Sequence, residues 1–337
     1  MFPPRTSDDG ADGSYSDWYG SMAGSGQRAP AWETYHTREL IPFIDAAFPT
    51  VATRADRFVA GLSSGGGGAM KYAAANPGTF GAAGAFSGAV DTDLSWPSYP
   101  AASEALWLAT LYPAYGPEGH CTWGDFIAQQ VIWRDNEATY KATNLRGTAL
   151  WMAAGDGTQG PYDPSPTFDP TEWTVNQMTQ ALMAQLDGAK IPYTAELYGP
   201  GTHTWPYWKR DLAHFLGWLR PRIGHAPPVP ARFDVRAARP HFTAWGWDFT
   251  AHRDVREFDY ITSVSAAGLD AVGSGTLDVV TPPVYAPGRL YTVGRAGADR
   301  RLRFTIDLGP SHETQQTSFD DAATGGWVHR HVRIAPR

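Results

Sequence analysis

The chain has 337 residues, of which 42% are hydrophobic and 18% charged, enough for a packed core and for two domains of roughly 150 residues each. Its net charge of −7 argues against a nucleic-acid binder, which normally carries a basic surface. No apolar run is long enough to predict a membrane span, and the first residues do not have the pattern of a signal peptide.

Short apolar runs alternate with helical patterns in the first two thirds of the chain. Strands are expected at residues 57–63, 81–88, 148–155 and 192–199. Apolar residues recur at helical spacing after Thr171 and again after Pro206. Strands that alternate with helices predict a mostly parallel sheet covered on both faces. We therefore expect an α/β domain over residues 1–223.

The pattern changes after a Pro-rich linker at residues 224–233. Beyond the linker, apolar residues alternate with a period of two: Trp245, Trp247 and Phe249 form one such series, and Leu302, Phe304, Ile306 and Leu308 form another. Glycine-containing turn signals at 273–275 and 286–288 separate these runs. Alternation between turns predicts a small antiparallel β domain, of the sandwich type, over residues 234–337.

The sequence GLSSG at residues 61–65 matches the G-x-S-x-G pattern of a nucleophile elbow. In an elbow, a serine lies on a tight turn between a strand and a helix that pack closely, which is why small residues surround it. The motif follows the first predicted strand directly and precedes four glycines. A glycine-rich turn without any chemistry would give the same string, but the context favours Ser63 as a nucleophile.

A serine hydroxyl needs a base to become a good nucleophile. In an α/β-hydrolase the base follows the last strand, and His203 lies there, just before the final predicted helix. His214 falls inside that helix, where a structural role is expected. The acid should follow the third strand, and the candidates there are Asp156, Asp163, Asp169 and Glu172. Spacing alone favours Asp156.

With these motifs, the chain resembles the mycolyltransferases of the antigen 85 complex, within the wider esterase D-like group. The resemblance covers roughly residues 7–223. It is carried by SYSDWY (14–19), WETYHTREL (32–40), the elbow with its helix and the next strand (61–88), and GTHTWPYW (201–208). The elbow and the histidine loop are specific in combination.

The resemblance implies a serine acyl-transfer enzyme that needs no metal or cofactor. The family's acid is a glutamate at the start of a helix, and Glu172, 31 residues before His203, matches it better than Asp156 does. Trp205 and Trp208 match aromatic positions near the sugar site. The backbone N–H of Ser64 would donate a hydrogen bond to the oxyanion. Export to the cell wall or the outside of the cell is expected from the family alone.

The chain also departs from the family pattern. The family has strands before the matching part, and these supply a second oxyanion donor, so we expect the natural protein to be longer and the elbow strand to lie at a sheet edge. The family's cysteine near the site is replaced by Ala154, and Cys121, the one cysteine of the chain, lies elsewhere. Residues 92–146 match poorly, which leaves the substrate undefined.

Three functions remain open at this point. The first is transfer of a long acyl chain between sugar esters, and the second is hydrolysis of acyl esters by a carboxylesterase. Both use the same three residues, Ser63, Glu172 and His203. The third is an inactive hydrolase fold that serves as an adhesion or scaffold protein. The expected partner is an acylated sugar or lipid ester, without nucleic acid.

Overall fold

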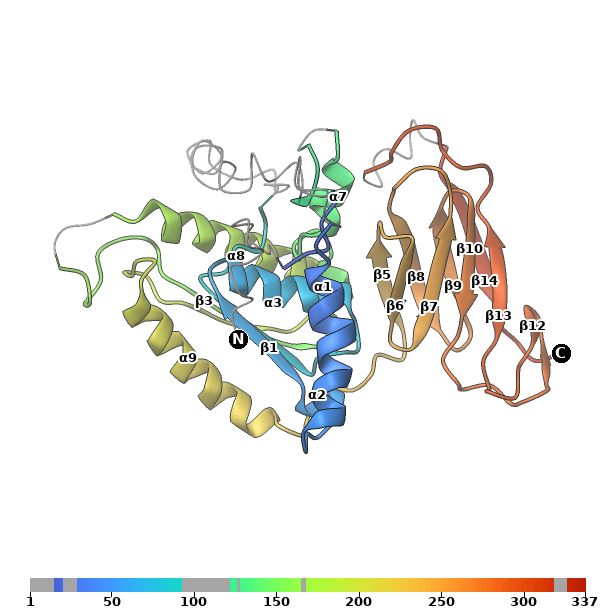
Figure 1. Cartoon of the computed structure of the whole chain (residues 1–337), viewed down its shortest axis with the longest axis horizontal. Helices are drawn as coiled ribbons and strands as arrows, with labels where there is room; N and C mark the ends of the chain where they lie inside the picture. The colour runs from blue at the N-terminus through green and yellow to red at the C-terminus, as the bar shows by residue number, and fades with distance from the viewer. Residues whose placement is uncertain (1–14, 21–28, 93–121, 126–127, 165–167, 318–325) are drawn as a thin grey trace.

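The computed structural model describes residues 15–20, 29–92, 122–125, 128–164, 168–317 and 326–337. The first part of the chain is built on a four-stranded parallel sheet in the order β1-β2-β3-β4 (Figure 1). The strands are β1 (Phe58–Leu62), β2 (Ala82–Phe86), β3 (Ala149–Ala154) and β4 (Thr194–Leu197). Each strand lies within a run predicted to form one, so the predicted α/β fold with a parallel sheet is confirmed.

Helices cover both faces of this sheet (Figure 1). The long ones are α3 (Ser64–Ala75), α8 (Pro170–Gly188) and α9 (Trp205–Leu219). Side chains of a strand point alternately to opposite faces. In β2, Phe86 packs against Phe215 of α9, whereas Ala83 belongs to the core under α3 and α8. The sheet therefore has an apolar layer on each side, as a buried parallel sheet requires.

A continuous helical segment runs beside the outer edge of β1. It consists of α1 (Trp32–Thr34), a π-helical turn (Tyr35–Leu40) and α2 (Ile41–Ala47). The shorter elements of this part are 3₁₀ turns at Arg54–Asp56, Ala142–Leu145 and Arg220–Arg222, and helix α7 (Gln130–Asp135). Within the described residues no strand pairs with the outer edge of β1.

The second part of the chain is a β-sandwich of two four-stranded antiparallel sheets. One sheet has the order β13-β10-β7-β6, and the other has the order β14-β9-β8-β5. Their strands are β5 (Phe233–Ala237), β6 (His241–Ala244), β7 (Trp247–His252), β8 (Asp259–Ser265), β9 (Gly268–Gly273), β10 (Thr276–Val280), β13 (Arg303–Asp307) and β14 (Val328–Arg333). A small hairpin of β11 (Leu290–Tyr291) and β12 (Gly294–Arg295) is added. Both sheets contribute to one apolar core. The antiparallel β structure predicted for this part of the chain is confirmed.

Trp245 lies outside the alternating series in which the sequence placed it. Trp247 and Phe249 do lie on one face of β7, with nearly parallel rings 6.2 Å apart. Trp245 instead occupies the turn between β6 and β7 at φ +52°, and its N–H donates to the carbonyl of Pro77. Its ring packs where Gly78 and Gly147 have no side chain. The β6–β7 turn therefore packs against the α/β part through Trp245.

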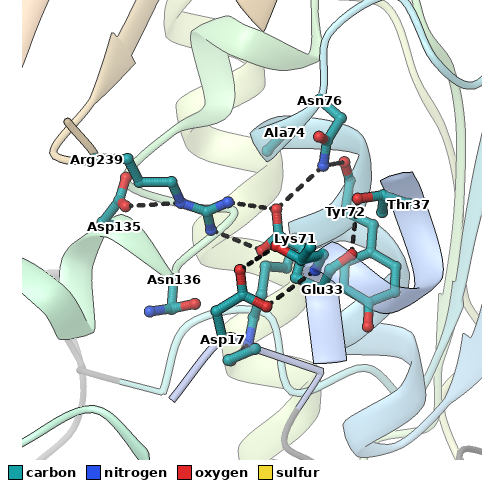
Figure 2. Close-up of polar contacts among 12 residues, drawn as sticks. Asp17, Glu33, Thr37, Lys71, Tyr72, Ala74, Asn76, Asp135, Asn136 and Arg239 are labelled. Atoms are coloured by element: carbon teal, nitrogen blue, oxygen red, sulfur yellow. Dashed lines mark hydrogen bonds and ion pairs between the residues drawn. The ribbon is translucent and has the colours of Figure 1, made fainter. Parts of the chain in front are cut away.

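The two parts share a core and a buried ion network. Phe258 and Tyr260 of the sandwich belong to the same apolar cluster as α3 and α8. Arg239, in the turn between β5 and β6, reaches across to Glu33 of α1 and Asp135 of α7 (Figure 2). Its Nη2 lies 2.6 Å from Glu33 Oε2, and its Nε lies 3.2 Å from Asp135 Oδ2. The domain boundary at residues 224–233 stays a prediction. The α/β part and the sandwich on either side of it pack extensively against each other.

Candidate active site

Ser63 lies on a strained turn between β1 and α3. Its φ of +52° and ψ of −126° are rare for a residue with a side chain, and such strain is typical of functional positions. The turn is held because the Ser63 N–H donates to Phe86 and the Ser63 carbonyl accepts from Gly66, Gly67 and Ala89. A Cβ at Gly61 would stand 2.3 Å from the Gly65 carbonyl oxygen, so the close approach of strand and helix needs glycine there.

Three predicted site residues meet at the strand ends of the sheet. Ser63 Oγ lies 2.8 Å from His203 Nε2, and His203 Nδ1 lies 2.8 Å from Glu172 Oε2. A carboxylate accepts hydrogen bonds, so the Nδ1 proton faces Glu172 and Nε2 is left to accept the Ser63 proton. Glu172 is fully buried and His203 is slightly exposed, so the histidine is accessible and its acid is shielded from water.

Two further donors hold Glu172, and the sequence pattern did not reveal them. Glu172 Oε1 accepts from Ser87 Oγ at 2.8 Å and from the Gly155 N–H at 2.6 Å. Ser87 lies just after β2 and Gly155 just after β3, so both come from the edge of the sheet at which Ser63 stands. A buried carboxylate needs several donors, and these two fix its orientation toward the histidine. The only indication of these two donors in the sequence is the general need of a buried carboxylate for several hydrogen-bond donors.

Asp169 connects Glu172 and His203 through their backbones. It is the N-cap of α8, where its Oδ1 accepts from the N–H groups of Thr171 and Glu172 at 2.9 and 3.1 Å. Its Oδ2 accepts from the His203 N–H at 2.8 Å. One carboxylate thus sets the start of the helix that carries Glu172 and the position of the loop that carries His203.

The other candidate acids have different partners. Asp156 Oδ1 accepts from the N–H and the hydroxyl of Thr158, which makes it part of a local turn. Asp163 accepts from the hydroxyls of Thr202 and Tyr207. Of the candidates that the sequence offered, Glu172 alone is in hydrogen-bond contact with the His203 ring in the described structure. His214, for which a structural role is expected, lies on the surface of α9, and its Nδ1 contacts Glu196 of β4.

The two predicted substrate-binding tryptophans lie beside His203. The Trp208 ring stands edge-on to the His203 ring at 4.9 Å, and its Nε1 donates to Ser87 Oγ at 3.2 Å. Trp205 is 64% exposed and packs edge-on against Trp208. Both tryptophans line a largely apolar hollow of about 870 Å³, together with Leu62 and Phe86 from the ends of β1 and β2. An apolar chain bound there would reach the strand end that precedes Ser63.

A buried carboxyl group lies behind the site, on α9. Asp211 is fully buried, and only one of its oxygens, Oδ1, has a hydrogen-bond partner among the described residues, Arg210. Burial raises the pKa of Asp211 to about 7, even though Arg210 opposes the shift, and the negative charge of Glu172 adds to the increase. Asp211 is therefore protonated in a large share of molecules at neutral pH.

The remaining predictions concern groups that are expected to be absent and residues that lie outside the described part of the chain. Ala154, where the family has a cysteine, is buried at the end of β3. Cys121 and most of the poorly matching segment lie outside the described residues. In the part of the chain that the structure describes, no three His, Cys, Asp or Glu side chains are grouped to hold a metal ion. None of its helices has the length and apolar character needed to cross a membrane.

A serine on a strand–helix turn, a histidine after the last strand and a buried glutamate, joined at the strand ends of a parallel sheet, define the α/β-hydrolase class. The chain belongs to the esterase family, because the family model described as "Putative esterase" matches residues 4–219. The predicted resemblance is thereby confirmed at the level of the family.

Several known proteins are similar to this chain. Esterase Rv1288 of Mycobacterium tuberculosis (strain H37Rv) is 31% identical over 224 residues, which cover 62% of this chain and 44% of that protein. The diacylglycerol acyltransferase/mycolyltransferase Ag85C of Mycobacterium avium is 27% identical over 205 residues, 59% of this chain and 55% of that protein. The crystal structure of Mycobacterium tuberculosis MPT51 (FbpC1) aligns with a TM-score of 0.47 at 20% identity, over 64% of this chain and 73% of that one. The chain thus spans about half the length of the curated relatives.

Proposed function

We propose that the chain transfers acyl groups from esters through an acyl-enzyme, with Ser63 as nucleophile, His203 as base and Glu172 as the acid that orients it. The observation that carries the proposal is the unbroken hydrogen-bond chain from Ser63 Oγ through the His203 ring to Glu172. Membership of the esterase family supports the same reaction class.

The reaction follows from the direction of these hydrogen bonds. Ser63 Oγ attacks the ester carbonyl carbon while His203 Nε2 takes the hydroxyl proton, and Glu172 stabilises the imidazolium. The carbonyl oxygen becomes an oxyanion near the start of α3, where the Ser64 N–H has no helical carbonyl to bond. When the tetrahedral intermediate collapses, the C–O bond to the alcohol breaks and His203 returns the proton to the leaving oxygen. An acceptor hydroxyl or water then releases the acyl group by the same steps in reverse.

The finer proposal is that the acyl group is a long chain and the acceptor is a sugar hydroxyl, as in a mycolyltransferase. The apolar hollow lined by Trp205 and Trp208 supports a long acyl chain, because apolar surface buried there is removed from water. The relation to Ag85C supports transfer, while the relation to Rv1288, named an esterase, supports release to water. Hydrolysis is therefore the second candidate. Export stays a prediction.

The reaction class is tested by hydrolysis of a p-nitrophenyl ester. Ser63→Ala and His203→Gln should each lower kcat by about 10⁴-fold or more, and Glu172→Gln by about 10²–10⁴-fold, because the latter loses the tautomer that presents Nε2 to the serine. Ser265→Ala, in the distant sandwich, is the matched serine control and should keep full activity. Unchanged activity in Ser63→Ala would exclude Ser63 as the nucleophile, whereas a parent chain without activity would favour the scaffold alternative.

The acyl pocket and the acceptor need separate measurements. Trp205→Ala should reduce activity on p-nitrophenyl laurate more than on p-nitrophenyl acetate. The control is Phe43→Ala, which removes a similarly exposed ring, 62% against 64%, on the distant helix α2. Equal effects of Trp205→Ala on both esters would exclude this hollow as the binding site of the acyl chain. The ratio of acylated sugar to free acid, measured with a sugar present, then separates transfer from hydrolysis.

A further inference from the structure

Ser87 stands between Glu172 and helix α9. It is fully buried, directly follows β2 and has a φ of +47°, in the left-handed region that a residue with a side chain rarely adopts. Its N–H donates to the Ala153 carbonyl at 2.7 Å, which helps to hold this conformation. Its hydroxyl oxygen contacts Glu172 Oε1 at 2.8 Å and Trp208 Nε1 at 3.2 Å. Backbone strain of this kind is typical of functional positions.

The chemistry of the two partners fixes the direction of both hydrogen bonds. An indole N–H can only donate, and a carboxylate can only accept. The Ser87 oxygen therefore accepts from Trp208, and the hydroxyl proton points to Glu172 Oε1. A hydroxyl that accepts a hydrogen bond is also a better donor, because the first bond polarises the second. The indole N–H thus acts on Glu172 through Ser87.

This chain of hydrogen bonds decides which oxygen of Glu172 faces the histidine. Oε1 accepts from the Ser87 hydroxyl and from the Gly155 N–H at 2.6 Å. Oε2 is thereby left for His203 Nδ1, at 2.8 Å. If the Ser87 proton pointed elsewhere, Oε1 would lose one of these two donors and the carboxylate would be freer to rotate. The alignment of Glu172 with His203 therefore depends on the direction of one hydroxyl proton.

Trp208 also contacts His203 directly. Its ring stands edge-on to the imidazole, with centroids 4.9 Å apart and planes at 89°. It comes from the first turn of α9, which begins two residues after His203. One tryptophan thus contacts His203 with its ring and reaches Glu172 through Ser87. Because Ser87 engages its N–H, a contact of Trp208 with a sugar would use the ring alone.

We propose that Trp208 is a positioning residue, which fixes the direction of the Ser87 hydroxyl and thereby keeps Glu172 Oε2 turned toward His203. The inference rests on the proposed function, because it presupposes that Ser63, His203 and Glu172 act together. Groups in one hydrogen-bond network do not contribute independently. The effects of removing the Trp208 N–H and the Ser87 hydroxyl should therefore not add.

The test is Trp208→Phe, which removes the indole N–H and keeps an aromatic ring at this position. We expect kcat for p-nitrophenyl acetate to fall about 3- to 10-fold, the factor for loss of one neutral hydrogen bond. KM should be unchanged, since the acetyl group is too short to extend along the hollow. In a Ser87→Ala background no hydroxyl is left to orient, so adding Trp208→Phe should lower kcat less than about twofold further.

Trp218→Phe is the matched control on the same helix. Trp218 is half-buried like Trp208, and its Nε1 donates to Thr194 Oγ1 at 3.0 Å, so this change also removes one indole hydrogen bond to a hydroxyl. It lies ten residues further along α9, about 15 Å at the rise of an α-helix. Both variants should lose similar stability in urea unfolding, but only Trp208→Phe should lower kcat.

The outcomes separate this inference from the proposed function. If Ser63→Ala abolishes activity but Trp208→Phe keeps kcat within twofold of the parent, the positioning role is wrong and the nucleophile stands. If Trp208→Phe lowers kcat by the same factor with and without the Ser87 hydroxyl, its effect does not pass through Ser87 and the inference is overturned. An equal loss of kcat in Trp218→Phe would also overturn it. If Ser63→Ala leaves activity unchanged, the proposed nucleophile itself fails.

Discussion

Replacement of Arg239 by methionine should be among the most destabilising single changes on the molecule. Arg239 comes from the turn between β5 and β6 and pairs with two buried carboxylates of the α/β part, Glu33 and Asp135, which are 2% and 1% exposed (Figure 2). Burial alone would raise the pKa of Glu33, but the Arg239 guanidinium overcomes this and holds it below its ordinary value. The charge of Glu33 thus depends on the arginine.

The size of the effect follows from the partners that Glu33 and Asp135 each retain when Arg239 is replaced. Asp135 keeps the Lys141 ammonium at 3.2 Å and the Ala238 N–H at 3.2 Å. Among the described residues, the side-chain donor that Glu33 keeps is the Asn76 amide, at 3.1 Å from Glu33 Oε1. Removing one partner of a buried ion pair costs about 3–5 kcal/mol, because the remaining charge is left uncompensated. We therefore expect a loss of about 3–5 kcal/mol, most of it from Glu33.

Urea unfolding at pH 7.5 measures this loss. Arg303→Met is the matched control, since its pair with Asp299 is exposed (58% and 43%) and should contribute little to stability. Adding Glu33→Gln to Arg239→Met removes the stranded charge and should recover part of the loss. In Arg239→Met the pKa of Glu33 should rise, so the deficit should shrink as the pH falls toward 5. A deficit below 1 kcal/mol, or a double variant no more stable than Arg239→Met, would refute the reasoning.

Three other changes have definite expected outcomes. Ser87→Ala removes one of the donors to Glu172 and should lower kcat about 5- to 30-fold, from a lost buried hydrogen bond of about 1–2 kcal/mol; unchanged kcat would contradict this. Because the folded chain raises the pKa of Asp211 to about 7, stability should be lost as the pH rises from about 4 to about 7, and Asp211→Asn should flatten that dependence in unfolding curves. Trp245→Ala empties the space against Gly78 and Gly147 and should cost about 2–3 kcal/mol; a melting temperature equal to that of the parent would refute this packing role.

The fold of the α/β part could be predicted because each local signal agreed with the next. The strand pattern at 57–63, the GLSSG turn and the small residues after it describe one strand–turn–helix unit, and β1 and α3 form that unit. The helical spacing after Thr171 likewise corresponds to α8. Periodicity reports which face of an element is buried, and in these segments it had no competing reading.

The contacts between the two parts could not be predicted from the sequence. A period of two predicts a strand, but it does not tell whether the first member of the series lies in the strand or in the turn before it. Trp245 therefore read as a strand residue, although tertiary packing draws it into the turn against Pro77 and Gly78. Arg239 stands in no sequence motif, and its partners Glu33 and Asp135 lie 206 and 104 residues away along the chain.

The site shows the same limit at closer range. Ser63 and His203 stand in motifs, so residue type and order single them out. The residues that hold Ser63 and His203 in place do not stand in motifs. Ser87 and Asp169 take part through hydrogen bonds to Glu172 and to the His203 backbone, and Ser87 is 85 residues from its partner. Such contacts depend on which strand ends come together, which a sequence shows only after the topology is known.

Labelling with a fluorophosphonate tests the central proposal most directly, because the reagent reacts with a serine only when a base activates it. Intact-mass measurement should show one adduct per chain, and peptide mapping should place it on Ser63. The adduct should be absent in Ser63→Ala, slowed in His203→Gln and retained in Ser265→Ala. A chain that takes up no reagent, or that is labelled equally in Ser63→Ala, would contradict the assignment of Ser63, Glu172 and His203 as the catalytic residues.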